Sequence, residues 1–139
     1  MREIKFRGFS KKHQQWLTGN YILNRGAHFI APVDEPADGK TWEDYEVDPD
    51  TVGQFTGLTD KNGREIYEGD IVLAQGFHPD YDKKHKCIMA WDKMDCRWRA
   101  TMPIGVHTGS DWPLSTPNIL EIIGNIHEHH ELFNIKQEQ

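Results

Sequence analysis

A turn at residues 60–63, with the sequence Asp-Lys-Asn-Gly, constrains the fold of this chain more than any other feature. A two-residue loop over Asn62 and Gly63 would set side chains of like charge opposite each other in two successive pairs, which disfavours it. A three-residue loop with Gly63 in the left-handed conformation instead pairs Asp60 with Arg64. The sequence therefore predicts an antiparallel hairpin with that register.

Short apolar runs elsewhere indicate more strands. Ile4 and Phe6 alternate with charged residues and predict an N-terminal β hairpin or meander over residues 1–30. The run over residues 119–126 predicts a buried strand with a bulge at Gly124, followed by a short helical turn over 128–133. A length of 139 residues fits a single domain over residues 1–139. Because the patterns above indicate strands, the fold predicted for this domain is mainly β. The core candidates near the turns are Leu58 opposite Ile66, together with Ile71, Val72 and Ile123.

A second hairpin is predicted from residues 87–91 and 96–100, joined by a four-residue loop at 92–95. In that register Trp91 lies opposite Cys96, and the two strands share one apolar face. Side chains alternate along a strand, so the residues between the apolar ones point to the other face. The apolar face is expected to hold Cys87, Met89, Trp91, Cys96, Trp98 and Ala100, and the outer face Arg97 and Arg99.

The same register predicts the state of the two cysteines. Cys87 and Cys96 would lie four residues apart along the ladder, roughly 13 Å, whereas a disulfide tolerates only about 7 Å between Cα atoms. Both thiols are therefore expected to be reduced, buried beside Trp91 and Trp98, and slow to react.

An acidic segment containing Pro and Gly is predicted to form an irregular loop over residues 31–53. Eight acidic residues and one basic residue, Lys40, fall within residues 34–50, so we expect this stretch to be exposed, and mobile unless a partner neutralises it. The whole chain carries 16 Lys and Arg against 22 Asp and Glu, a formal charge of −6. Such a balance lacks the broad positive surface that non-specific duplex binding requires, so nucleic acid is not the expected partner.

The sequence contains nothing typical of export or membrane insertion. The segment Met1–Arg7 has no apolar run of the kind found in signal peptides, and no window approaches eighteen apolar residues. The two cysteines have no Cys-x-x-Cys spacing, which fits a reducing compartment. We therefore expect a cytoplasmic protein with no membrane partner.

Three segments combine turn glycines and apolar residues in a specific way: 1–12 (MREIKFRGFSKK), 54–72 (QFTGLTDKNGREIYEGDIV) and 120–128 (LEIIGNIHE). The middle segment is the most distinctive, because its Gly, Asn and Asp positions are hard to match by chance. In this order the segments resemble the YopX family of phage and prophage proteins. The resemblance implies a mainly β fold with an SH3-like barrel over residues 54–139, a phage or prophage origin, no assigned catalytic activity, and no catalytic residues to carry over.

Turn chemistry explains the glycines of these segments without a ligand, so we interpret the segments as architectural. The sequence departs from the family in the acidic segment, in the loop over 76–86, and at His129 and His130, where Asn-Pro is expected. A partner particular to this member would be bound at one of those stretches.

The histidines near the end of the chain form the one cluster with metal-ligand character. On a helix His127 and His130 would share a face, and on a strand His127 and His129 would, so either geometry supplies two ligands. Exposed tail histidines are the expected interpretation, and no metal or other cofactor is predicted. A metal site would need further ligands from His78, His85 or Cys87.

Arg97, Trp98 and Arg99 could contribute to a site for single-stranded nucleic acid, through base stacking and phosphate contacts. Strand alternation argues against this, because it places Trp98 on the face opposite the two arginines. The other residues of such a site would be Trp91, Trp112, Lys83 and Lys84.

No motif for catalysis is present: the sequence has no GxSxG elbow, P-loop, dinucleotide fingerprint or HExxH. We predict a phage or prophage accessory protein that acts by binding protein, either as a homo-oligomer or with a phage or host partner, and not by catalysis. The alternatives are a module that binds single-stranded nucleic acid, an enzyme, and a metal-binding protein.

Overall fold

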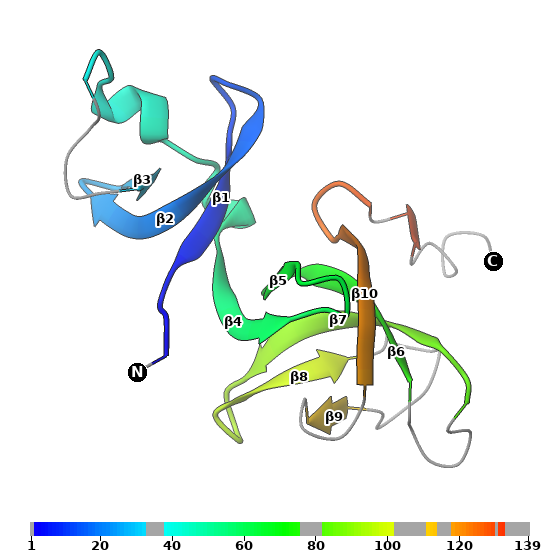
Figure 1. The fold of residues 1–139 in the computed structure, drawn as a ribbon. Coiled ribbons are helices and arrows are strands. Elements are labelled where there is room, and N and C mark those ends of the chain that lie inside the picture. Colours follow the sequence, from blue (N-terminus) through cyan, green and yellow to red (C-terminus); the bar gives the residue numbers. More distant parts are fainter. Residues whose placement is uncertain are drawn as a thin grey trace. The chain divides into compact units, whose positions relative to one another are not determined.

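The computed structural model describes residues 2–32, 38–75, 82–101, 111–113, 118–129 and 131–132. In those ranges the chain forms two antiparallel sheets and short 3-10 helices, so the fold is mainly β, as predicted (Figure 1). The chain divides into two compact units, Met1–Gly57 and Leu58–Gln139. The boundaries expected from the sequence, 1–30, 31–53 and 54–139, stay predictions, as does closure of the second part into an SH3-like barrel.

The first unit is built on a β meander. Consecutive strands pair antiparallel, and β4 pairs with the free side of β1. This confirms the predicted N-terminal meander, but the first strand begins at Phe6, leaving Ile4 outside it and 57% exposed. The strands are β1 (Phe6–Ser10), β2 (Gln15–Asn24), β3 (Ala27–Ala31) and β4 (Gly53–Thr59).

The acidic segment packs against this meander in its described part, residues 38–53. It forms two 3-10 helices, η1 (Trp42–Tyr45) and η2 (Pro49–Thr51), and between them the Val47 N–H donates to the His28 carbonyl at 2.9 Å. Tyr45 and Val47 are 8% and 4% exposed, so the expectation of an exposed loop is wrong at these two positions. Backbone pairing with β3 turns every second side chain inward, and the acidic residues alternate with these.

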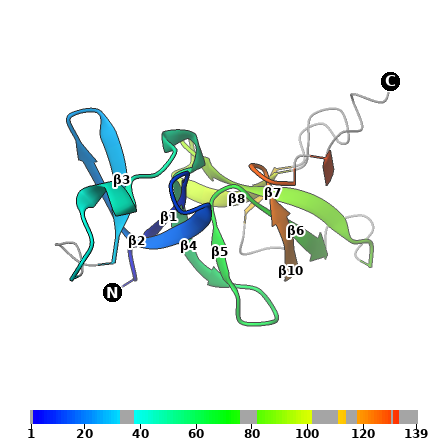
Figure 2. The same cartoon turned by 90° about the horizontal axis from the view of Figure 1, so that it is seen from above.

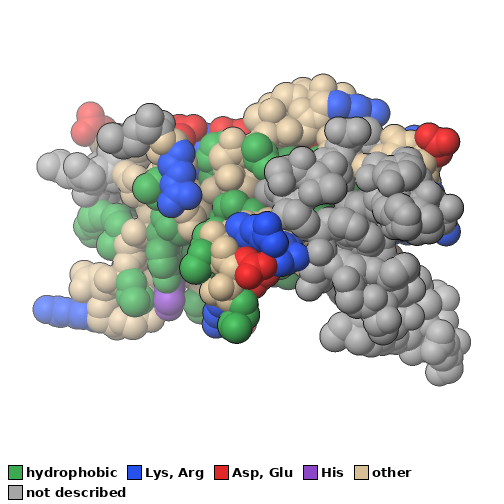
Figure 3. Space-filling view, turned by 90° about the horizontal axis from the view of Figure 1, so that it is seen from below, with side chains coloured by type: hydrophobic (Ala, Val, Ile, Leu, Met, Phe, Trp, Pro, Cys, Tyr) green, Lys and Arg blue, Asp and Glu red, His purple; other side chains and the backbone are tan. Residues whose placement is uncertain are grey.

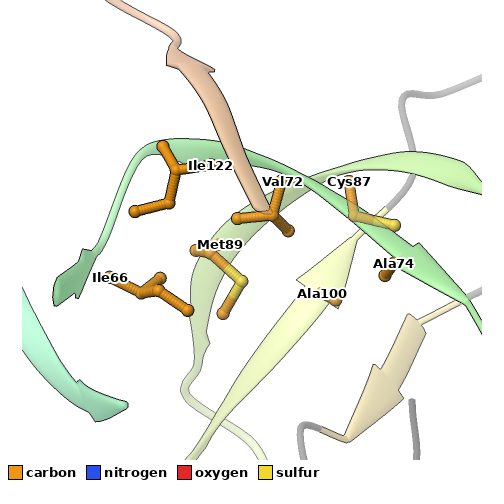
Figure 4. Close-up of a cluster of buried hydrophobic side chains, with 7 residues drawn as sticks. All are labelled: Ile66, Val72, Ala74, Cys87, Met89, Ala100 and Ile122. Carbon is orange, nitrogen blue, oxygen red and sulfur yellow. The ribbon is translucent and has the colours of Figure 1, made fainter. Parts of the chain in front are cut away.

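The second unit holds a five-stranded sheet in the order β10-β6-β7-β8-β9. Figure 2 shows β10 running beside β6, as it also does in Figure 1. The strands of this sheet are β6 (Asp70–Gln75), β7 (His85–Asp92), β8 (Arg97–Thr101), β9 (Asp111–Pro113) and β10 (Asn118–Asn125). The second unit also contains β5 (Glu65–Tyr67), which belongs to the other sheet and is the neighbour of β4 there. The buried cluster of the second unit, drawn in Figure 4, consists of Ile66, Val72, Ala74, Cys87, Met89, Ala100 and Ile122.

Three of the five predicted core candidates are fully buried, and Leu58 and Ile123 are the exceptions. Ile66, Ile71 and Val72 are fully buried, whereas Leu58, expected opposite Ile66, is 40% exposed. Ile122 replaces Ile123 in the core because the pairing of β10 with β6 shifts between Ile122 and Gly124. This shift confirms the predicted bulge. The bulge changes which side chain of β10 points into the core, from the expected Ile123 to Ile122.

The first predicted hairpin is confirmed. Gly63 has a φ of 80°, and its N–H donates to the Asp60 carbonyl at 3.0 Å. The Asp60 N–H donates to the Arg64 carbonyl at 2.8 Å, which closes the three-residue loop. The choice of register from charge pairing was therefore correct.

The described part of the C-terminal tail forms the expected turn: the Leu132 N–H donates to the His129 carbonyl at 3.0 Å. None of the helices in the described ranges has the length and apolar composition needed to cross a membrane.

Candidate functional site

The hairpin of β7 and β8 carries the most conspicuous combination of aromatic and charged side chains in the second unit. Trp91 pairs with Trp98 and Asp92 with Arg97, leaving Lys93–Cys96 as the loop. The predicted register, with Trp91 opposite Cys96, is therefore wrong by two residues. The observed register brings two indoles and one pair of opposite charges face to face, and such cross-strand pairs stabilise an antiparallel ladder.

Asp92 fixes where the loop starts. Its Oδ1 atom accepts hydrogen bonds from the Met94 N–H at 2.9 Å and the Asp95 N–H at 3.3 Å, so the side chain caps the loop. Cys96 completes the loop in the left-handed conformation, with a φ of 53°. The predicted four-residue loop included Asp92, whereas in the structure Asp92 is the last residue of β7 and its side chain caps the loop.

The new register also corrects the placement of the cysteines. Both are free, as expected, but Cys96 is exposed in the loop instead of buried beside the tryptophans. Cys87 is fully buried, and burial raises the pKa of its thiol to about 12. The two thiols are therefore expected to differ in reactivity, whereas the sequence predicted that both would be buried and slow to react.

One face of the hairpin is apolar and extends beyond the core. Along β7 the inward side chains Cys87 and Met89 are fully buried, but the next one, Trp91, is 41% exposed. Its ring meets that of Trp98 edge-on, with 5.0 Å between centroids. Met94, at the loop, is 91% exposed. The prediction that the tryptophans are core residues is thus wrong for Trp91, and Trp98 is half-buried.

The other face of the hairpin carries a compact network of ion pairs. The Arg99 guanidinium donates to the carboxylates of both Asp92 and Asp95, and Arg97 pairs with Asp95 at 3.0 Å. The hydrogen bond that Arg99 donates to Asp92 raises the pKa of Arg99, partial burial opposes this, and the hydrogen bond donated to Asp95 raises the pKa further. Burial would raise the pKa of Asp92, but hydrogen bonds from the Asp95 N–H, from Arg99 and from the Met94 N–H outweigh it, and the pKa falls below its ordinary value.

These ion pairs bear on the hypothesis of a nucleic-acid site. The side chains of Arg97 and Arg99 do lie on the face opposite Trp98, but each already pairs with a carboxylate, which competes with a phosphate. The exposed residues Lys83 and Lys84 precede β7, whereas the arginines follow the loop at its other end, roughly 20 Å away. The described residues are therefore not gathered into one basic patch. The side chain of Trp112 lies outside the described residues.

The described histidines of the predicted cluster, His127 and His129, lie in a tight turn. The Asn125 Oδ1 atom accepts from the N–H groups of His127 at 2.9 Å and Glu128 at 3.0 Å. The His129 N–H donates to the Asn125 carbonyl, and its Nδ1 atom accepts from the Asn125 N–H at 3.2 Å. Because the Nδ1 atom of His129 already accepts a hydrogen bond within the turn, it is not available as a metal ligand. His129 also lies so close to Gly124 that a Cβ atom there would be 2.7 Å from the ring.

The described residues contain no group of three or more His, Cys, Asp or Glu side chains that could hold a metal ion. His78 and His130, two of the candidate ligands, lie outside the described residues. Among the others, Cys87 is fully buried and its thiol is held in the protonated form, which is a poor ligand.

The distinctive turn segment holds the edge of β10. The Asp60 Oδ2 atom accepts from the buried Ile122 N–H at 3.1 Å, and the Arg64 Nη1 atom donates to the Ile122 carbonyl at 3.4 Å. The Asp60 Oδ1 atom accepts from the N–H groups of Asn62 and Arg64, both at 2.9 Å. Burial would raise the pKa of Asp60, but these three hydrogen bonds and the charge of Arg64 lower it. A carboxylate and a guanidinium thus complete an edge that would otherwise offer unpaired backbone groups.

Comparison with known proteins agrees with this architecture. The family model of the YopX protein matches residues 5–134. The chain belongs to the YopX family. It is also similar in structure to protein EF1440 from Enterococcus faecalis, at 23% sequence identity and a TM-score of 0.54, over 95% of this chain and 99% of that one. This likeness supports the fold. No curated protein matches the chain.

Proposed function

We propose that this YopX protein is a phage or prophage accessory protein that acts in the host cytoplasm by binding protein, and that it assembles into a homo-oligomer. The observation that carries the proposal is the apolar end of the β7–β8 hairpin, where Trp91 is exposed beside Trp98 and Met94 is exposed in the loop that follows. Membership of the YopX family supports the phage or prophage setting of this proposal.

Two physical arguments favour a protein surface as the ligand of this face. Trp, Met and Arg are enriched at protein interfaces, and Trp dominates the residues that contribute most to affinity. The ion pairs of Arg97 and Arg99 leave the charged side of the hairpin close to neutral, so that the binding energy has to come from the apolar side. In Figure 3, hydrophobic side chains reach the surface beside Lys, Arg, Asp and Glu side chains.

Light scattering at a low and a high protein concentration tests the proposal. The unmodified protein should have a mass above that of one chain, and Trp91→Ser combined with Met94→Ser should reduce it to one chain. Ile4→Ser, which removes an exposed apolar side chain from the other unit, should leave the mass unchanged. A protein that stays monomeric at high concentration, or a double variant that keeps the oligomer, would refute the proposal.

A further inference from the structure

The second half of β2 has an open edge. β1 pairs with β2 only as far as Gly19, and β3 pairs with residues 20–24 on the other side. The segment before β1 continues along β4 instead, where the Lys5 carbonyl accepts from the Phe55 N–H at 2.9 Å, and it runs away from the far end of β2 (Figure 1). Within the part of the chain that the structure describes, residues 20–24 therefore have a neighbouring strand on one side only.

The hydrogen-bond pattern of the β2–β3 hairpin shows which backbone groups face this edge. In an antiparallel ladder alternate residues bond to the partner strand, and the residues between them direct their N–H and C=O groups to the opposite side. His28 faces away from β2, because its carbonyl accepts from the Val47 N–H. Leu23 lies directly opposite His28, and Tyr21 is two residues before it, so both direct their backbone groups to the open edge. No hydrogen bond reaches these four groups from the described residues.

This edge lacks the features that normally prevent a strand from pairing with another chain. Proteins protect exposed edges with charged side chains, proline or bulges. Residues 20–24, with the sequence Asn-Tyr-Ile-Leu-Asn, contain no charge and no proline, and they pair with β3 without a register shift. Leu23 is 60% exposed. An uncharged edge with four open backbone groups is a template for a further strand.

The edge is complementary to itself when two copies run antiparallel. With a two-fold axis at Ile22, Tyr21 of each copy lies opposite Leu23 of the other, and all the open backbone groups are paired. The two Ile22 side chains then meet across the axis, and Asn20 lies opposite Asn24. Aromatic and β-branched pairs of this kind stabilise an antiparallel ladder.

The neighbouring registers are excluded by the same geometry. An axis at Tyr21 would require Gly19, which already pairs with Phe6 of β1. An axis at Leu23 would require Arg25, which lies in the hairpin loop with a φ of 52°. The axis at Ile22 thus leaves both open residues paired and disturbs neither β1 nor the loop.

The face that carries Ile22 is also suited to a second copy. Ile22 lies opposite Phe29 in the ladder, and both line an apolar pocket of about 160 Å³ together with Asn24 and Trp42. Trp42 stands edge-on to Phe29, with 5.7 Å between ring centroids, and is 39% exposed. Ile22 of the second copy would lie next to this row and extend the apolar surface across the axis.

We infer that two copies of this chain pair through the edge of β2, antiparallel and about a two-fold axis at Ile22. This contact joins first units, whereas the hairpin face proposed above belongs to the second unit. Two five-residue strands bury less than the roughly 1,200 Å² typical of stable interfaces, so a single pair of chains separates on dilution. In the oligomer proposed above, several edges are carried together, and multivalency strengthens the pairing. That strengthening rests on the proposed function, but the pairing itself does not.

Disulfide trapping at high protein concentration tests the pairing and its register. In a Cys96→Ser background, Ile22→Cys should form a covalent dimer under mild oxidation, because residues opposite each other without mutual hydrogen bonds lie about 4.5 Å apart at Cα. Asn20→Cys and Asn24→Cys should each stay monomeric, since identical residues are then four positions apart along the ladder, roughly 13 Å. An equal mixture of these two variants should form the covalent dimer.

A substitution at Leu23 tests the backbone hydrogen bonds. Leu23→Pro removes an N–H that the hairpin itself does not use, a position where an edge strand tolerates proline. It should lower the rate of Ile22→Cys trapping about 10-fold or more, as expected for the loss of intermolecular hydrogen bonds. Leu23→Val keeps the N–H and should retain the rate.

Amide hydrogen exchange gives a measurement on the unmodified protein. The Tyr21 and Leu23 amides should exchange more slowly as the protein concentration rises. The Ile22 and Asn24 amides, which bond within the hairpin, should exchange at a constant rate.

Three results would overturn the inference: a folded Ile22→Cys protein that gives no covalent dimer, single Asn20→Cys or Asn24→Cys variants that dimerise as fast as their mixture, or exchange at Tyr21 and Leu23 that is independent of concentration. Trapping should persist in the Trp91→Ser, Met94→Ser protein. Light scattering on that protein tests the hairpin face separately, so the two proposals can fail independently.

Discussion

Replacing Asp60 by Ala should destabilise the protein more than any other single change in the turn segment. The substitution removes the acceptor of three backbone N–H groups, those of Asn62, Arg64 and Ile122. Water can reach the first two, whereas the Ile122 N–H is buried, and an unsatisfied buried donor costs about 1–3 kcal/mol. With a further loss of about 1 kcal/mol for the exposed, charge-assisted bonds, the free energy of unfolding should fall by about 3 kcal/mol. For a chain of this length that lowers Tm by roughly 10 °C.

Thermal unfolding followed by circular dichroism measures this effect, and two variants control for it. Asp60→Asn keeps the shape and one acceptor oxygen and should lose only about 1–2 kcal/mol. Lys61→Ala changes an exposed neighbour and should stay within about 0.5 kcal/mol. If Asp60→Ala melts at the temperature of Lys61→Ala, the bond to Ile122 does not hold β10 and the reasoning is refuted.

The same carboxylate predicts a dependence of stability on pH. Because the pKa of Asp60 is lower in the folded protein than its ordinary value of 3.8, the ionised group stabilises the fold fully above that value. This contribution is lost as the pH falls from there through the folded-state pKa. The difference in stability between the unmodified protein and Asp60→Asn should therefore be constant near neutral pH and shrink below about pH 4. A difference that is the same at pH 3 and pH 7 would contradict the assignment.

Three further predictions concern the turns and the thiols. Gly63→Val should cost more than about 1 kcal/mol, because a β-branched residue is forced to positive φ, while Gly63→Asn should cost less; equal melting temperatures would count against the strain. A thiol reagent should modify Cys96 rapidly and Cys87 only on unfolding, so two equal rates would contradict the hairpin register. Gly124→Ala should destabilise by about 1–3 kcal/mol through a clash with the His129 ring, and His129→Ala should recover part of the loss in the double variant; strict additivity would show that no clash occurs.

The most distinctive family segment, residues 54–72, has a structural role in this protein. Asp60 and Arg64 hold β10, and Asp70, only 2% exposed, accepts the Tyr67 N–H at 2.7 Å in the following turn. This explains why a resemblance in these residues predicts the fold well and says little about a ligand. The surfaces proposed for self-association lie instead at the β7–β8 hairpin and at the edge of β2, outside the three segments that carry the resemblance.

The sequence by itself determined what short-range chemistry controls. Charge pairing across four residues, with one glycine at positive φ, was enough to set the Asp60–Arg64 register, and the apolar residues next to the turns identified Ile66 and Val72 as core residues. In the second hairpin, several loops satisfy the same alternation, and the choice depends on which side chains meet across the strands. There the pairing of Trp91 with Trp98 decided the register.

Only the tertiary structure decided the rest, because the partners are far apart in the sequence. The bond from Ile122 to Asp60 joins residues 62 positions apart, and no local pattern indicates which buried N–H a turn carboxylate will accept. Likewise the sequence showed a run of acids around Tyr45 and Val47, whereas pairing of that stretch with His28 on β3 buried both side chains. Exposure of Trp91 has the same origin: alternation predicts the face of a strand, but the extent of the core beneath that face is set by the strands that pack against it.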